Sequence, residues 1–441
     1  MNKKIPQVSF ITVLKNSKRI LNNPLPFHKE NFEKHGDIFE VSLGFGKSAI
    51  FTRDEELIKH MLQDQHRKYQ KSPLQTDDLG HYIGRGLLTS NGEYWLKQRR
   101  LIQPAFYKKK LENVKTLIVS TIYKELERLH TSEKITVLPL MSDIAFKVVG
   151  KSLFSYDDGN AMQRLQQITN QVQEDLIKEI RQPYKRWWFK LSGKIKKTES
   201  LAKESRDILR DIIDARIASK KEYDDLLDML LHSKYEDGSN MSMEQLIDEI
   251  LILFAAGHET TSNALVFTLM LLSKNTTEQN KIYQEVKSLN ADKLSMMEFF
   301  AKVPFTKNCI NEAMRLYPPV YFSDRIAMED NKFKNLEIKK GTTILTSFFE
   351  VHRSSKFWNS PETYNPDRFN NIPTKKLSNW FFPFGAGPRM CVGSNMAMYE
   401  MLVVISEIVK KFHVKPVFEN IEIKPLITLK PLNSELIFEK R

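Results

Sequence analysis

A cysteine in a glycine-rich turn is the group in this sequence best suited to hold a metal. Cys391 follows Phe-Gly-Ala-Gly-Pro-Arg-Met, residues 384–390, and helix-forming residues resume soon after it. A cysteine binds metal as the thiolate, which a helix N-terminus favours. Glycines lack a Cβ and let a backbone approach a flat cofactor, while Arg389 can reach a cofactor carboxylate. The turn therefore predicts a cofactor site, with a buried free cysteine as the alternative.

A polar patch interrupts the most apolar part of the chain. Residues 256–261, Ala-Gly-His-Glu-Thr-Thr, lie between apolar runs at residues 250–256 and 264–272. Glycine and threonine are poor helix formers, and a threonine hydroxyl bonded to a carbonyl one turn earlier can bend a helix. We expect the bend to open a groove for a diatomic ligand, and Glu259 to connect that groove to solvent. A packing role for Thr260 is the alternative, and His258 is expected to fill space.

The cysteine turn resembles the haem-binding loop of the cytochrome P450 family, and the polar patch resembles that family's oxygen-activation motif. The positions that match the haem loop are Phe384, Gly387, Arg389, Cys391, Gly393 and Ala397. The resemblance covers nearly the whole chain. It implies haem b (iron protoporphyrin IX) with Cys391 as the metal ligand, and Phe384, Arg389 and Gly393 as further cofactor contacts. Glu259 and Thr260 would then be the catalytic residues that deliver protons.

Two other segments resemble haem-contacting elements of the family. Trp95 and Arg99 are four residues apart on one predicted helix face, where an indole N–H and a guanidinium could donate to a haem propionate. Arg325 follows a Pro-Pro pair and matches an arginine that contacts a propionate.

A further part of the resemblance is structural. Glu312 and Arg315 are three residues apart, so they can pair on one helix face. Arg368 lies in Pro-Asp-Arg-Phe, residues 366–369, which resembles a Pro-Glu-Arg-Phe element of the family. The resemblance implies that Glu312, Arg315 and Arg368 form a buried structural network. Asp367 departs from the commoner glutamate.

The implied activity is that of a soluble, bacterial-type haem-thiolate monooxygenase. Thiolate ligation favours O–O cleavage, and the cycle consumes O₂, two electrons and two protons. The enzyme would hydroxylate or oxidatively O-dealkylate a small organic substrate. A peroxide-driven haem-thiolate peroxygenase and a non-catalytic haem-binding protein are the alternatives, and the Glu259–Thr260 pair argues for O₂ chemistry.

The substrate pocket is expected, by family analogy, to draw on several separated segments. Its predicted lining residues are Tyr82, Leu88, Phe254, Ala256, Val320, Phe322 and Leu429. Fatty acids, terpenoids and an O-methyl ether all remain open as substrates.

The net charge of +13 is concentrated in three segments. Residues 95–115 and 370–391 are expected to face an acidic redox partner, a ferredoxin or flavodoxin with its reductase, which passes on electrons from NAD(P)H. Residues 181–197 hold seven basic side chains beside Trp187 and Trp188 and are expected on the substrate-entry side. Aromatic and basic side chains together suit a sugar-like or anionic ligand and a membrane surface equally well. Nucleic acid is not an expected partner.

The elements that must position these residues are mostly helical. We expect a mainly α protein with a minor β-sheet region (α+β), the cytochrome P450 fold, in a single domain over residues 1–441. Strands are expected near residues 36–53, 321–347 and 413–440, and the helical core over residues 93–316 and 394–412. Residues 241–273 should form one long central helix over the haem, and residues 71–91 an irregular loop.

Composition sets the remaining limits. With 441 residues and 41% hydrophobic side chains, the chain can form a core and is not disordered. Two cysteines exclude a disulfide framework. The first 27 residues hold no apolar run long enough for a signal peptide or anchor. We therefore expect a cytoplasmic monomer without a transmembrane anchor.

Overall fold

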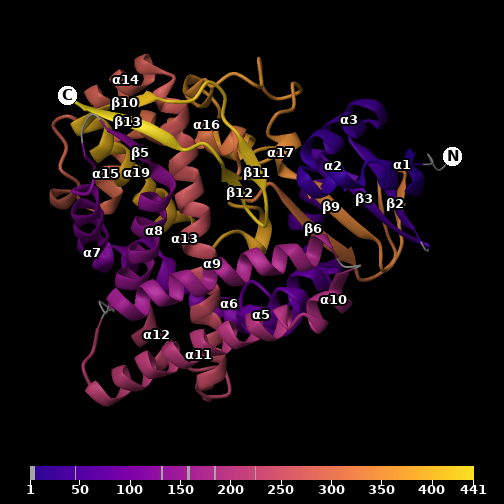
Figure 1. Cartoon of the computed structure of the whole chain (residues 1–441), viewed down its shortest axis with the longest axis horizontal. Coiled ribbons are helices and arrows are strands. Elements are labelled where there is room, and N and C mark those ends of the chain that lie inside the picture. The colour runs from indigo at the N-terminus through magenta and orange to yellow at the C-terminus, as the bar shows by residue number, and fades with distance from the viewer. Residues whose placement is uncertain (1–4, 45, 131–132, 156–158, 183–184, 224) are drawn as a thin grey trace. The chain divides into compact units, whose positions relative to one another are not determined.

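The computed structural model describes residues 5–44, 46–130, 133–155, 159–182, 185–223 and 225–441 (Figure 1). The chain forms two compact units, each assembled from separated segments. The sheet unit comprises Met1–Ser72, Asn311–Cys391 and Glu422–Leu432. The helical unit comprises Pro73–Ile310, Val392–Ile421 and Asn433–Arg441.

The sheet unit is organised by a six-stranded sheet of order β1-β2-β3-β9-β6-β4. Its strands are β1 (Gln7–Val8), β2 (Ile38–Gly44), β3 (Lys47–Thr52), β4 (Tyr69–Gln70), β6 (Phe322–Ala327) and β9 (Thr343–Ser347). Alternate residues of a strand face one side, and Phe39 and Val41 of β2 are buried against Phe27 and Phe32. Strands from the N-terminal and later parts of the chain therefore share one sheet, coloured indigo and orange in Figure 1.

Smaller elements complete the sheet unit. Two hairpins pair β7 (Asn331–Phe333) with β8 (Leu336–Ile338), and β11 (Ile423–Pro425) with β12 (Leu429–Pro431). Its helices are α1 (Phe10–Lys15), α2 (Ser17–Asn22), α3 (Leu25–His35), α4 (Glu55–Lys59), α17 (Phe348–Val351) and α18 (Thr374–Leu377). Helix α16 (Pro304–Leu316) contributes its C-terminal part to this unit.

The helical unit contains the longest elements of the chain. Its helices are α5 (Gly80–Ile83), α6 (Gly92–Ile102), α7 (Lys108–Leu126), α8 (Val137–Phe154), α9 (Gly159–Arg181), α10 (Arg186–Leu191), α11 (Lys194–Ser219), α12 (Leu226–His232), α13 (Met243–Ser273), α14 (Thr276–Val286), α15 (Met296–Lys302) and α19 (Ser394–Lys411). A three-stranded sheet joins β10 (Phe412–Pro416), β13 (Glu435–Lys440) and β5 (Lys134–Thr136). Helices α9 and α11 lie side by side (Figure 1) and are joined by an ion pair between Arg164 and Glu204.

Helix α13 is the central element of this unit. Ser242 caps it by accepting a hydrogen bond from the Gln245 N–H, and its apolar side chains are almost all buried. Gly257 lets α8 pack closely, because a Cβ there would lie 2.9 Å from Cγ2 of Val149. Among the described residues α13 is long and apolar enough to cross a membrane, but 83% of its apolar window is buried inside the protein.

The predicted mainly α fold with a minor β region is confirmed, and the predicted long helix over residues 241–273 corresponds to α13. The stretch 71–91 differs from the expected irregular loop. It contains a π-helical turn at Leu74–Asp78 and the short helix α5. Such short turns carry no amphipathic period long enough to be read from sequence.

Candidate active site

The turn that carries Cys391 belongs to the sheet unit. The Cys391 N–H donates to the Phe384 carbonyl at 2.9 Å, and the cysteine itself is exposed. Gly385 and Gly387 both have left-handed backbones, with φ of 74° and 68°. A Cβ on Gly387 would overlap the carbonyl oxygen of Leu62, whereas one on Gly385 would meet nothing within 4 Å. Gly387 is therefore required by packing of the protein against itself, a reason that the sequence did not reveal.

Three cations gather in the same unit. Arg325 bonds to the Ser323 hydroxyl at 2.9 Å and the Asp324 carbonyl at 2.7 Å. Burial lowers the pKa of Arg325 to about 10, with Asp324 opposing the change. Burial also lowers the pKa of Lys71 well below its usual value, and the charges of Arg325 and Arg389 lower it further. The like charges of these side chains destabilise their charged forms. A bound anion would offset this repulsion.

Strand pairing explains why Lys71 lies in this cluster. Strand β4 is antiparallel to β6, with Gln70 opposite Ile326. The next residue in register places Lys71 at the level of Arg325. Lys71 could not be predicted from sequence, because a two-residue strand has no readable period.

The donor set fits haem. Haem carries two propionates, and Lys71, Arg325 and Arg389 supply three cations against one carboxylate, Asp324. The Ser72 hydroxyl already donates to that carboxylate. Among the described residues no group of three or more His, Cys, Asp or Glu side chains could hold a bare metal ion. Cys391, a single exposed cysteine beside a cationic cluster, is suited to ligate a metal that is already bound in an anionic macrocycle such as haem.

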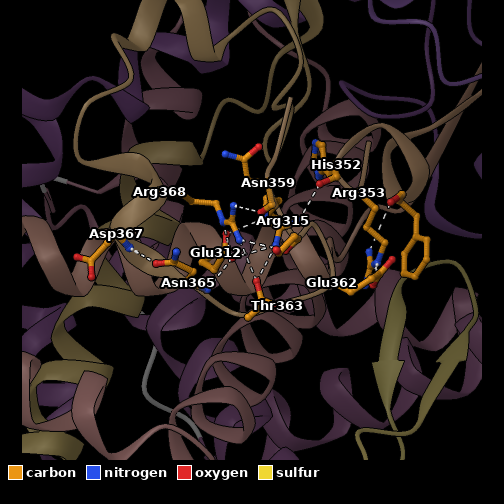
Figure 2. A network of polar contacts seen from close by, with 12 residues as sticks. Glu312, Arg315, His352, Arg353, Asn359, Glu362, Thr363, Asn365, Asp367 and Arg368 are labelled. Atoms are coloured by element: carbon orange, nitrogen blue, oxygen red, sulfur yellow. Dashed lines mark hydrogen bonds and ion pairs between the residues drawn. The ribbon is translucent and has the colours of Figure 1, made fainter. Parts of the chain in front are cut away.

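Glu312, Arg315 and Arg368 meet in the sheet unit, as Figure 2 shows. Arg315 Nε donates to Glu312 Oε2 at 2.7 Å, and both side chains are fully buried. Arg368 Nε donates to Glu312 Oε1 at 2.9 Å. Both arginines direct their other hydrogens to backbone carbonyls, including that of Thr363. The carboxylate thus serves two guanidiniums at once.

Asp367 lies at the edge of this network. Its N–H donates to the Asn365 side chain at 3.1 Å (Figure 2). Its carboxylate accepts from Asn370 at 3.0 Å. Glu312 receives the Asn365 N–H instead. Asp367 is exposed, and the pairing of Glu312 with Arg315 and Arg368 is present beside it.

The polar patch lies in the middle of α13, in the helical unit. Thr260 donates its hydroxyl hydrogen to the Ala256 carbonyl at 2.8 Å, the expected bond to the previous turn. Ala256 is exposed and Thr260 half-buried, whereas the helix on both sides of them is buried. Small side chains at residues 255–257 and Thr260 thus form an accessible strip on a helix that is otherwise buried.

The neighbours of Thr260 on α13 are buried, whereas Thr260 is half-buried. Glu259 is buried, with 5% of its surface exposed. His258 packs edge-on against Phe146, and its Nδ1 bonds to the Phe254 carbonyl at 3.1 Å. That position agrees with a space-filling role for His258.

The remaining cofactor candidates of the helical unit are Trp95, Arg99 and Gly393. Trp95 and Arg99 lie four residues apart on α6, the first buried and the second half-buried. Arg99 Nε donates to Gln103 at 2.8 Å. Gly393 precedes α19, and a Cβ there would lie 3.8 Å from the Phe106 ring, an ordinary contact.

The predicted pocket residues have unlike environments. Tyr82 is buried and donates its hydroxyl to Glu179 at 2.8 Å, and Phe254 is stacked with Phe146 and Phe154 in the helical core. Leu429 is fully buried and its N–H donates to the Pro319 carbonyl. The other four are accessible to different degrees: Ala256 and Val320 are exposed, and Leu88 and Phe322 are half-buried.

Comparison with known proteins identifies the family. The cytochrome P450 family model matches residues 5–438. A cytokinin hydroxylase of Arabidopsis thaliana is 32% identical over 92% of this chain and 81% of its own length. The Arabidopsis protein LUTEIN DEFICIENT 5, chloroplastic, is 27% identical over 87% of this chain and 68% of its own. Probable cytochrome P450 4s3 of Drosophila melanogaster is 28% identical over 88% and 82%.

These relatives are plant and animal proteins, and one is named as chloroplastic. The expectations of a bacterial-type enzyme and of a cytoplasmic location therefore have no support. Haem b as cofactor, and electrons from NAD(P)H through a redox partner, follow from the family. With a family model that spans nearly the whole sequence, this chain belongs to the cytochrome P450 family and is a haem-thiolate monooxygenase.

Proposed function

We propose that this enzyme hydroxylates a C–H bond of a small organic molecule, and that Thr260 and Glu259 control the delivery of protons. Hydroxylation as the reaction type is supported by the plant relative that is named a cytokinin hydroxylase. Oxidative O-dealkylation begins with the same C–H hydroxylation and belongs to the same proposal.

The observation that carries the proposal is the hydroxyl of Thr260. In its bond to the Ala256 carbonyl, Thr260 holds its own hydrogen on the helix backbone and turns its lone pairs outward as acceptors. Rotation of the hydroxyl converts it from acceptor to donor without any movement of α13. Because Thr260 lies on the opened strip of α13, it can pass a proton to a reacting group there.

The cofactor is proposed to be held by Cys391 as the metal ligand and by Lys71, Arg325 and Arg389 at its carboxylates. Phe384, Gly393, Trp95 and Arg99 remain proposed contacts. Bound haem supplies the redox chemistry that activates O₂. The protein supplies the thiolate, the cationic cluster and the proton donor.

The test of proton control is Thr260→Ala, compared with Thr268→Ala. Thr268 makes the same bond, to the Ala264 carbonyl at 2.7 Å, two turns further along α13 and fully buried. With added redox partners, we expect Thr260→Ala to consume NAD(P)H and release peroxide while forming about 10- to 100-fold less product. Thr268→Ala should keep product and NAD(P)H consumption matched.

Fully coupled turnover by Thr260→Ala would refute proton control by this hydroxyl. Efficient product formation from peroxide alone, unaffected by Thr260→Ala, would favour the peroxygenase alternative.

The ligand assignment is tested by Cys391→Ser, with Cys309→Ser as its control. Cys309 is fully buried in α16. We expect Cys391→Ser to abolish the red-shifted absorption of the reduced carbonyl complex and Cys309→Ser to retain it. If Cys391→Ser retains that band, Cys391 is not the ligand.

The redox partner is proposed to be an acidic ferredoxin or flavodoxin. Support comes from Lys108, Lys109 and Lys110, which are consecutive and exposed. Other basic residues of this region are engaged within the protein: Arg100 pairs with Glu236, and Lys115 donates to the Asp292 and Leu294 carbonyls. Reduction of the haem should therefore slow at high salt, and neutralising Lys108–Lys110 should abolish most of that salt dependence.

A further inference from the structure

A turn of the helical unit is bonded to two adjacent carboxylates of α13. The Arg85 N–H donates to Asp248 Oδ2 at 2.7 Å, and the Leu87 N–H donates to Glu249 Oε2 at 2.9 Å. The intervening Gly86 N–H turns the other way, to the Thr89 hydroxyl at 3.1 Å. Alternate amides of one turn thus reach two consecutive acids of one helix.

Glycines make this close approach possible. A Cβ on Gly84 would overlap the Asp248 carboxylate, and Gly84 has a left-handed φ of 86°. A Cβ on Gly86 would lie 2.6 Å from the Glu249 carboxyl carbon. The sequence Gly-Arg-Gly-Leu therefore fits against the two acids only because both glycines lack side chains.

The rest of the turn is bonded to its own segment. Thr89 donates its hydroxyl to the Gly84 carbonyl at 2.7 Å, and Tyr94 donates to the Arg85 carbonyl at 2.9 Å. Ser90 donates to the Gly86 carbonyl at 2.6 Å. The turn is consequently a rigid piece that can move as one body when its bonds to α13 break.

The two acids differ in what surrounds them. Asp248 forms an ion pair with Arg206 of α11. Glu249 is fully buried, and its Oε1 has no hydrogen-bond partner among the described residues. Burial, with a smaller contribution from the Asp248 charge, raises the pKa of Glu249 to about 8, although the Leu87 N–H opposes the change.

We propose that Glu249 is a proton-dependent clasp that holds the turn Gly84–Leu87 on α13, tight when its carboxyl is neutral and loosened when it ionises. A protonated carboxyl keeps its bond to Leu87 and places no charge in the core. An ionised carboxylate places a negative charge on the buried Oε1, next to Asp248. That charge is destabilised until the turn lifts and water can solvate it.

The direction of the pH effect follows from linkage. In the lifted state Glu249 meets water and regains its ordinary pKa near 4.5, whereas in the clasped state its pKa is about 8. The clasp is therefore strongest below about pH 4.5 and weakens progressively as pH rises to about 8. Opening increases by at most about tenfold for each pH unit in this window.

Other charged and titratable groups are packed around Glu249. Asp248 and Arg206 are ion-paired, Arg85 stacks on Tyr94, and burial raises the pKa of Tyr94 to about 12. Burial also raises the pKa of Tyr235. His81 of the neighbouring α5 pairs with Glu199 of α11 at 3.1 Å. The experiment therefore needs a control for His81.

Hydrogen exchange in the full-length, haem-loaded protein tests the clasp. The measured quantity is the protection of the peptide covering residues 84–91, corrected for the intrinsic rate at each pH from 5.5 to 8.5. In wild type we expect protection to fall as pH rises. In Glu249→Gln, which mimics the neutral carboxyl, protection should stay high at every pH.

The matched control is Glu244→Gln, which removes an exposed carboxylate of α13 that pairs with Arg210. It should retain the wild-type pH profile, and both variants keep His81, so any contribution of that residue is the same in both. Equal pH slopes in wild type and Glu249→Gln would overturn the proposal. If Glu249→Gln did not fold, pH-independent protection in wild type would overturn it instead.

The consequence for substrate entry rests on the proposed function together with the predicted substrate pocket, which includes Tyr82 and Leu88 on either side of this turn. Entry, followed as the rate of the substrate-induced Soret shift, should quicken with pH in wild type and not in Glu249→Gln. Loss of that shift in every variant would count against the proposed substrate site. The exchange result would still decide the clasp.

Discussion

Two groups of arginines in the sheet unit differ in what balances their charge. Arg315 and Arg368 share Glu312, and their other hydrogens go to carbonyls of the chain (Figure 2). Arg325 lies instead in a cluster with Lys71 and Arg389, where charges of the same sign lower the pKa of Lys71. The first group is satisfied by the protein itself. The second is proposed to be balanced by a ligand that brings negative charge.

The comparison teaches how a structural arginine differs from a ligand-binding one. Both groups are largely enclosed, and residue type does not distinguish them. The balance of charge does, since Glu312 binds two arginines, whereas Asp324 acts on both Arg325 and Lys71 with Arg389 close to them as a third cation. Substitutions in the first group should therefore lower the stability of the fold with or without haem. Substitutions in the second group should mainly weaken haem binding.

The largest expected effect is in the first group. Glu312→Gln would leave two buried guanidiniums without their carboxylate, and we expect a loss of about 3–5 kcal/mol in the free energy of unfolding. Urea denaturation should show this loss with and without haem. A loss below about 1 kcal/mol would mean that the backbone carbonyls alone balance the two arginines.

The second-largest effect is expected in the second group, on the affinity for haem. Arg325→Gln removes a cation from the cluster, and we expect haem binding to weaken by about 10- to 100-fold, the value of one charge-assisted hydrogen bond. A haem titration of the apoprotein measures it. Unfolding of the apoprotein should change far less than in Glu312→Gln, and a reversed order would contradict the comparison.

A smaller effect of opposite sign is expected for Lys71→Met in the apoprotein. Because the folded state lowers the pKa of Lys71, its charge destabilises the fold. Removing it should therefore stabilise the apoprotein at pH 7, by an amount that water around the half-buried lysine reduces.

The pH dependence of that difference is a further check. The wild-type penalty should disappear as pH rises toward 10.5, where lysine is neutral in the unfolded chain as well. Denaturation of both proteins between pH 7 and 10 measures the trend. A difference that grows with pH would contradict the electrostatic explanation.

The smallest effect is expected at the edge of the first group. Asp367→Glu restores the commoner residue of the family, but Asp367 bonds to Asn365 and Asn370 and is exposed. Its unfolding free energy should change by less than about 0.5 kcal/mol. A change comparable to that of Glu312→Gln would show that this position does belong to the arginine network.

The sequence was most informative where one segment carries a whole pattern. The spacing around Cys391 and the apolar runs around Thr260 each lie within a single stretch, so the loop and α13 could be predicted directly. Lys71 could not, because its place depends on strand pairing with residues about 250 positions away. The role of Gly387 was hidden for the same reason, since Leu62 is what excludes a side chain there.

The most direct test of the ligand-binding group compares haem with its dimethyl ester, which lacks both carboxylate charges. If Lys71, Arg325 and Arg389 bind the propionates, wild-type apoprotein should prefer haem by at least about tenfold. Lys71→Met should bring the two affinities closer together. Equal affinities of wild type for the two macrocycles, or an unchanged preference in Lys71→Met, would contradict this account.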